Sequence, residues 1–237
     1  MHVPGISRAA LIAMIVFAVA LLGTGAAWLL SWATHHTDTD TQVLSAEASI
    51  EISSDHGDVR VVGSDRADVL LTIKERRSIF GGPHVSSRYA DGRLRLHTTC
   101  SGAQLFGNGC AVSYVVEVPR AMAVGVVASS ADVHAEDVGG PLAVHVSSGD
   151  VHVDAPSRDI VTTTSSGDIH VRASDATRVR AHATSGDVHV SVPDRSYAVQ
   201  TRAIGGDQHI DVDDNPSAPR RLVASTTSGD LHIEPDG

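Results

Sequence analysis

The stretch SSGDVHV, residues 147–153, decides the fold of this 237-residue chain. Related segments are DHGDVRV at 55–61, SSADVHA at 129–135, SSGDIHV at 165–171, TSGDVHV at 184–190, IGGDQHI at 204–210 and TSGDLHI at 227–233. A sequence that places Gly, Asp and His in the same order so often repeats either a chemical site or a piece of architecture. The residues around each glycine decide between the two.

Apolar or small residues alternate with polar ones on both sides of each glycine, as in Leu142, Val144 and Val146 before Gly149. Strict alternation with a period of two predicts two short strands with one buried face each, joined at the glycine. Glycine suits such a corner because it adopts a positive φ without steric penalty. The predicted turn glycines are Gly57, Gly149, Gly167, Gly186, Gly206 and Gly229, with Ala131 standing in their place in one copy.

The spacing of the copies predicts an all-β, single-stack β-solenoid with coils of about 18–23 residues. In such a fold the coils lie about 4.8 Å apart, so that equivalent residues form columns. Regular repeats are expected at 123–237, preceded by wider, irregular first coils at 44–122 in one continuous domain, 44–237. The last coil, ending in LHIEPDG, carries no obvious cap, so its edge is a candidate surface for homo-oligomer formation.

Two polar columns are expected on the outer face of the stack. Asp directly follows the glycine mark, and His comes two residues later in every copy but the first, which has Arg60. Residues two apart on a strand point to the same side, so both columns should line one face. The Asp column contains Asp132, Asp150, Asp168, Asp187, Asp207 and Asp230, and the His column contains His134, His152, His170, His189, His209 and His232.

These columns admit three interpretations. In the structural one, each Asp holds its corner and each His covers the strand surface. In the second, imidazoles about 4.8 Å apart with carboxylates alongside bind a divalent transition metal such as Zn²⁺, Cu²⁺ or Ni²⁺, the one cofactor that the sequence suggests. In the third, the His column responds to pH, because protonation adds repulsion within the column and attraction to the Asp side chains.

The uncharged apolar run at 9–32 is long enough to cross a bilayer as a helix, for which roughly 20 apolar residues suffice. Arg8 precedes the run and the next basic residue is Arg60, which places the N-terminus in the cytoplasm. We therefore expect a cytoplasmic tail at 1–8, a single transmembrane helix at 9–32, a polar linker at 33–43 and an extracytoplasmic domain at the cell membrane. A cleaved signal peptide is the alternative.

Two cysteines, Cys100 and Cys110, bracket the short loop SGAQLFGNG. In an oxidising compartment this arrangement predicts a disulfide, which the chain-entropy model values at about 3 kcal/mol. Two unpaired buried thiols are the alternative, and a zinc site is disfavoured because no further ligands lie at suitable spacing.

Several function classes are disfavoured. A formal net charge of −10 argues against nucleic acid as a partner, because such binding depends on Lys and Arg. Ser148, Asp150 and His152 look like a hydrolase triad, but nearly every copy repeats them, whereas catalysis needs one positioned constellation. A polysaccharide-active β-helix enzyme is the remaining enzymatic alternative, yet beyond residue 32 only Phe80, Tyr89, Phe106, Tyr114 and Tyr197 could stack on sugars. We predict no catalytic residues.

An N-terminal apolar segment followed by iterated SGD and a β-strand resembles the toastrack, or "putative adhesin", family of bacterial extracytoplasmic β-solenoid domains. The resemblance covers roughly residues 45–237. It implies a cell-envelope domain with no assigned catalytic residues, often encoded with membrane-stress or antibiotic-response systems. The expected function is therefore that of a non-catalytic module for adhesion, or for envelope-stress sensing through an envelope or membrane protein partner.

Overall fold

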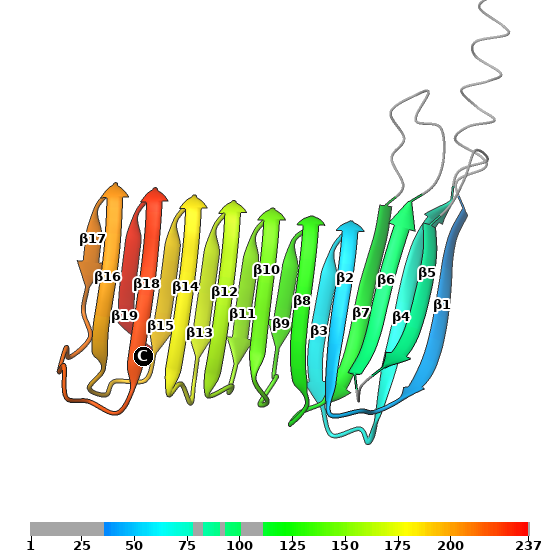
Figure 1. Ribbon diagram of the computed structural model, residues 1–237, viewed down its shortest axis with the longest axis horizontal. Helices are drawn as coiled ribbons and strands as arrows, with labels where there is room; N and C mark the ends of the chain where they lie inside the picture. Colours follow the sequence, from blue (N-terminus) through cyan, green and yellow to red (C-terminus); the bar gives the residue numbers. More distant parts are fainter. Residues whose placement is uncertain (1–35, 78–82, 91–92, 101–110, 237) are drawn as a thin grey trace, which may run out of the picture. The chain divides into compact units, whose positions relative to one another are not determined.

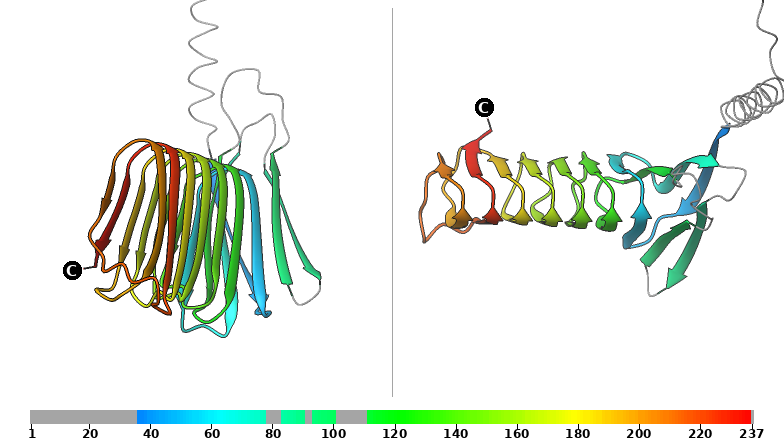
Figure 2. Two further views of the ribbon diagram at one scale, coloured as in Figure 1. Left: turned by 60° about the vertical axis from the view of Figure 1, so that its left-hand side comes forward. Right: turned by 90° about the horizontal axis from the view of Figure 1, so that it is seen from above.

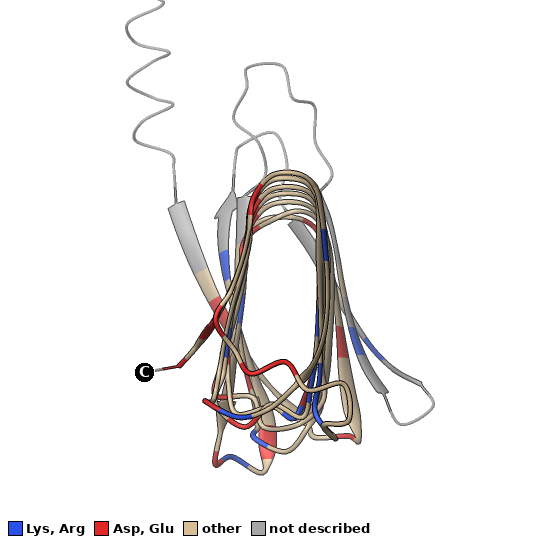
Figure 3. Cartoon of the chain, turned by 90° about the vertical axis from the view of Figure 1, so that its left-hand side faces the viewer, with Lys and Arg blue, Asp and Glu red and all other residues tan. Residues whose placement is uncertain are grey.

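A computed structural model describes residues 36–77, 83–90, 93–100 and 111–236. Within these residues the chain forms strands and turns and no helix, which confirms the predicted all-β class. Two sheets, sheet A and sheet B, face each other along a stack of coils (Figure 1; Figure 2). Figure 3 looks along this stack and shows the coils superimposed as flattened rings.

Within each sheet the strands neighbour one another in an order that differs from their order in the chain. Sheet A consists, from one edge to the other, of β1 (His36–Ser45), β4 (Asp68–Arg77), β7 (Ala111–Pro119), β3 (Val59–Ser64), β9 (Val133–Glu136), β11 (Val151–Ala155), β13 (Ile169–Ala173), β15 (Val188–Val192), β19 (Leu231–Pro235) and β17 (Gln208–Ile210). Sheet B consists, from one edge to the other, of β16 (Ala198–Gly205), β18 (Arg221–Ser228), β14 (Arg178–Ser185), β12 (Asp159–Ser166), β10 (Leu142–Ser148), β8 (Ala123–Ser130), β2 (Ser49–His56), β6 (Arg93–Cys100) and β5 (Pro83–Ala90).

Each regular coil gives one strand to each sheet, and the coils pair in parallel. In sheet B, Leu142 pairs with Val124 on one side and with Ile160 on the other. In sheet A, Val151 pairs with Val133 and Ile169 in the same way. Equivalent residues therefore form columns, as the repeat predicted.

The coils do not stack in the order of the chain. The coil β18–β19 lies between β14–β15 and β16–β17, and in Figure 1 its red ribbon lies between yellow and orange ones. Likewise, β2–β3 lies between β6–β7 and β8–β9. The expectation that the last coil of the chain forms the open end of the stack is therefore wrong. Because the coils share one pattern of alternation, that pattern does not fix their order, and the connection 211–220 brings the chain back to a place inside the stack.

The coil β16–β17 forms that end of the stack and is adapted to its place. Its inward-facing side chains are incompletely buried, and Gln208 is exposed in a column that elsewhere holds Val, Ile, Leu or Tyr. A terminal repeat with a polar face is what a stacked architecture needs for solubility. Ile204 and Ile210 nevertheless remain 62% and 39% exposed, so the edge still offers apolar surface.

The interior between the two sheets is built from thin columns of small and β-branched residues. Val144, Thr162 and Ala181 are neighbours in one such column, and each is fully buried. Columns of this kind run through every regular coil and join into one continuous apolar cluster. The predicted inward positions are confirmed, and they lose burial only in the terminal coil.

Replacing Thr162 by Val is expected to stabilise the protein by about 1 kcal/mol. Within the described part of the chain, Thr162 Oγ1 is buried without a hydrogen-bond partner, so the substitution removes a desolvation penalty and keeps the shape. Thermal unfolding should show a melting temperature higher by about 2–4 °C. Thr164 is the control, because its Oγ1 donates to Gly149 O at 3.3 Å. Equal gains from Thr162→Val and Thr164→Val would refute the explanation.

The first part of the domain departs from the predicted arrangement in two ways. Residues 36–43, expected in a polar linker, belong to β1 at the edge of sheet A, where alternate Thr residues have good strand propensity and the edge of β4 is available for pairing. The irregular first coils are also not wholly parallel, because β4 pairs antiparallel with β7, and β5 with β6.

Two other predictions fall partly or wholly outside the described residues. The transmembrane helix at 9–32 lies outside them, and within the described ranges no helix is long and apolar enough to span a bilayer. Cys110 also lies outside them, so the disulfide with Cys100 stays a prediction.

Candidate functional site

The glycine corners bring the backbones of successive coils into close approach. At Gly167, φ is +135°, and a Cβ atom there would lie 2.1 Å from Gly149 O. The same approach, within 2.0–2.2 Å, recurs at the other corners in the order of the stack: Gly149, Gly167, Gly186, Gly229 and Gly206. Glycine is therefore required at these corners by contact with the neighbouring coil, and at all of them but Gly206 also by a positive φ.

The Asp column ties each coil to the next. Asp150 Oδ1 accepts a hydrogen bond from the backbone N–H of Asp168 at 2.9 Å, and Asp168 Oδ1 accepts one from Asp187 N at 2.8 Å. The ladder runs without a gap in stack order through Asp132, Asp150, Asp168, Asp187, Asp230 and Asp207. One carboxylate oxygen of each Asp but the last is thus engaged structurally, between coils rather than within one corner.

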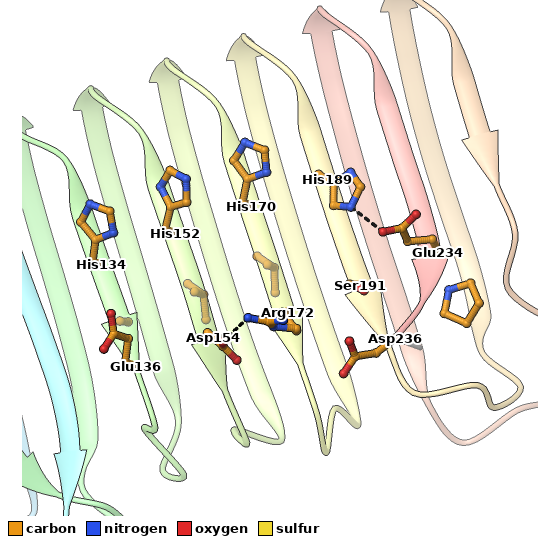
Figure 4. A pocket seen from close by; sticks show the side chains of 14 residues that line it. His134, Glu136, His152, Asp154, His170, Arg172, His189, Ser191, Glu234 and Asp236 are labelled. Carbon is orange, nitrogen blue, oxygen red and sulfur yellow. Dashed lines mark hydrogen bonds and ion pairs between the residues drawn. The ribbon is translucent and has the colours of Figure 1, made fainter.

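The six predicted histidines form one column on the outer face of sheet A, as expected. The ring centroids of His134 and His152 are 5.0 Å apart and those of His152 and His170 are 4.9 Å apart, with rings tilted by 17° in both pairs (Figure 4). Beyond His170 the spacing widens to 5.9–6.1 Å. The order at the end follows the stack, so that His232 lies between His189 and His209.

A second outer column, the acidic column, lies two residues beyond the histidines. It contains Glu136, Asp154, Arg172, Ser191 and Glu234, which are neighbours in register. The same alternation that placed the histidines would have found this column, but its members differ in residue type from coil to coil, so the repeat did not reveal it. Between the two columns lies a groove of about 520 Å³, the ladder groove, lined also by Asp236 (Figure 4).

The ladder groove has its own pattern of ion pairs. Arg60 Nη2 lies 2.7 Å from Glu136 Oε2, and Arg172 pairs with Asp154. At the other end, His189 Nε2 lies 2.9 Å from Glu234 Oε1. These side chains are largely exposed, so each pair contributes little to stability and chiefly sets the charge that a ligand would meet.

Partial burial and the neighbouring imidazoles of His170 and His134 lower the pKa of His152. The carboxylates of Asp150 and Asp132 act in the opposite direction and only partly compensate. The centre of the column therefore resists protonation more than a free histidine does.

The metal hypothesis has no direct support from the side-chain arrangement. Among the described residues, no group of three or more His, Cys, Asp or Glu side chains could hold a metal ion. Stacked rings present their faces to one another, whereas a metal ion binds in the plane of each ring. Metal binding stays a hypothesis that calorimetry with zinc or copper would test.

Two of the aromatic residues considered for stacking on sugars are not available at the surface. Tyr114 is 2% exposed and Tyr197 is fully buried, with its hydroxyl donating to Pro193 O at 3.2 Å. Burial raises the pKa of Tyr197.

Comparison with known proteins agrees with this architecture. The sequence pattern of the family described as Toastrack DUF4097 matches residues 44–234, while no curated protein matches the chain. Among solved structures, a "putative cell adhesion protein" from Clostridium sporogenes has a TM-score of 0.55 at 7% identity, covering 85% of this chain and 100% of that one. A "putative adhesin" from Bacteroides fragilis has a TM-score of 0.47 at 14% identity, covering 84% and 97%.

The family pattern spans the continuous stack, including the coils whose order departs from the chain, and the likeness to the Clostridium protein shows the same fold. The chain therefore belongs to the Toastrack DUF4097 family.

Proposed function

We propose that this protein is a non-catalytic binding module, anchored in the bacterial membrane and acting outside the cytoplasm in adhesion or envelope-stress sensing. The observation that carries the proposal is the uninterrupted register of the Asp and His columns beside the ladder groove. Regular columns present a wide, repetitive surface suited to contact with a partner, and a ladder of identical corners offers no single catalytic constellation. The description of the Clostridium protein as a cell adhesion protein is in keeping with this role.

Crosslinking in intact bacterial cells tests the proposal. A photo-crosslinking amino acid in place of His170 places the probe in the ladder groove, and one in place of Ser165 places it on the exposed side of sheet B. The two positions belong to one coil, so expression and folding are matched. A discrete adduct identified by mass spectrometry is expected from position 170 and not from 165. Equal labelling from both positions, or none from 170, would contradict the proposal.

The compact His column favours a second candidate function, a response of the binding face to pH. The groups that face His152 are His134 and His170 in the column, Asp132 and Asp150 at the corners, and Asp154 in the acidic column. Because the imidazoles lie so close together, acidification adds positive charges that repel one another along the whole groove.

His152→Gln is expected to reduce the loss of stability on acidification. The folded pKa of His152 lies below its ordinary value of 6.5, so the unfolded chain takes up the proton first as pH falls. Stability is therefore lost from about pH 6.5 downward, and the loss is complete below the folded pKa. Melting temperatures at pH 8 and pH 5 should differ less in the variant than in the wild type. His145→Gln, on the outer face of sheet B, is the control and should leave the difference unchanged.

A further inference from the structure

Two acidic side chains of the acidic column are already paired with guanidinium groups of the chain itself. Arg60 lies against Glu136 at 2.7 Å, and Arg172 is hydrogen-bonded to Asp154. In both pairs the arginine comes from a strand adjacent to that of the carboxylate. The wall of the ladder groove thus accepts a guanidinium group where a neighbouring arginine can reach it.

This pattern is interrupted at Ser191. In the register of sheet A, Ser191 lies between Arg172 and Glu234. Its side chain is too short to reach a carboxylate on the next strand. Within the described ranges no Arg or Lys lies within ion-pair distance of Glu234 or Asp236, although the charge of Asp236 is close enough to help raise the pKa of Arg172. Glu234 Oε1 is engaged by His189 Nε2 at 2.9 Å, which leaves Oε2 for another donor.

Ser191 also carries a polar group that lacks a partner. The residue is 8% exposed and lines the ladder groove, and among the described residues its Oγ makes no hydrogen bond within the protein. Solvent in the groove still reaches this hydroxyl, so it is free to bond to a ligand without first breaking a bond within the protein. Asp236 is held beside it, because its backbone N–H donates to Val192 O at 2.7 Å.

We infer that Ser191, Glu234 and Asp236 form a subsite for a guanidinium group of a ligand lying in the ladder groove. The N–H groups on one side of the planar guanidinium donate to Glu234 Oε2 and Ser191 Oγ. Those on the other side donate to the Asp236 carboxylate. Bound there, it continues the series that Arg60 and Arg172 begin. The inference rests on the proposed binding function and specifies the chemistry of its ligand, whose guanidinium comes either from a small molecule or from an arginine side chain.

Calorimetric titration of the full chain at pH 8 and low salt tests the subsite. The probes are agmatine, a small guanidinium compound, and the tripeptide Gly-Arg-Gly, with Gly-Gly-Gly as the uncharged control. We expect one-to-one binding with a dissociation constant near or below about 1 mM, as suits a ligand of few atoms. Glu234→Gln should weaken binding about tenfold and Ser191→Ala about threefold.

Asp159→Asn is the matched control, since it removes a carboxylate of sheet B that Arg178 Nη1 already occupies at 2.9 Å, and binding should stay unchanged. Asp236→Asn provides a second test if Glu234→Gln lowers the melting temperature. Binding of both probes supports an arginine side chain as the source, and binding of agmatine alone supports a small molecule. The inference is overturned if neither probe binds, or if the Glu234 and Asp236 variants bind as the wild type does. Crosslinks from position 170 that persist in that case would leave the proposed function standing.

Discussion

Gly167→Ala is expected to destabilise the protein by about 3–5 kcal/mol, more than most single substitutions do. The added Cβ would lie 2.1 Å from Gly149 O, and this obstacle is backbone, which no side-chain rotation can relieve. The φ of +135° adds strain for any residue with a Cβ. The melting temperature should fall by roughly 10 °C, or the chain should fail to accumulate in folded form.

Gly125→Ala is the matched control for this prediction. Gly125 lies on the outer side of β8, and the nearest atom to a Cβ there is Ile50 O at 3.8 Å, an ordinary contact. Alanine in a strand costs less conformational entropy than glycine, so a gain of about 0.5 kcal/mol is expected. If the two substitutions shift the melting temperature alike, close approach between corners is not what requires glycine.

Removing residues 221–237 is expected to disrupt the coil that precedes them in the chain. Those residues form β18 and β19, which separate β14–β15 from β16–β17. Burial of Leu222, Leu231 and Ile233 contributes about 1.5–3 kcal/mol for each side chain, and the deletion also removes every strand partner of β16 and β17. Amide exchange should therefore become fast throughout 198–210.

Limited proteolysis checks the same point, with removal of residues 236–237 as the control that leaves both strands in place. New cleavage sites between 193 and 220 are expected in the long truncation and not in the short one. A stack built in chain order would behave differently, because losing its last coil would leave 198–210 paired with the coil below. Continued protection of 198–210 after the long truncation would therefore contradict the observed order.

The local pattern around each glycine predicted most of the regular coils. Alternation at Leu142, Val144 and Val146 is enough to set which face is buried, because a shift by one residue would expose all three. The same rule placed His152 on the outer face, and its exposure and the stacking of its ring on those of His134 and His170 confirm it. The hydrogen bonds of the Asp ladder could not be predicted in the same way, because they join different coils and depend on which coils are neighbours.

Local sequence patterns do not predict which strands pair where the pattern is irregular, or where every coil has the same pattern. Residues 36–45 have the composition of a polar linker, yet the edge of β4 gives them a pairing partner that no local pattern indicates. Ser191 and Glu234 are far apart in the chain and share no motif. They are neighbours because β19 pairs with β15, so the proposed guanidinium subsite depends on strand pairing that the sequence does not reveal.

Composition and periodicity were sufficient to establish strands, glycine corners and an outer face of Asp and His, because each follows from residues a few positions apart. The order of the coils depended on the folded structure. The coils carry similar alternation, so alternation alone does not say which coils are neighbours, and in the folded chain β2–β3 and β18–β19 enter the stack out of sequence. That arrangement determines which groups meet in the ladder groove.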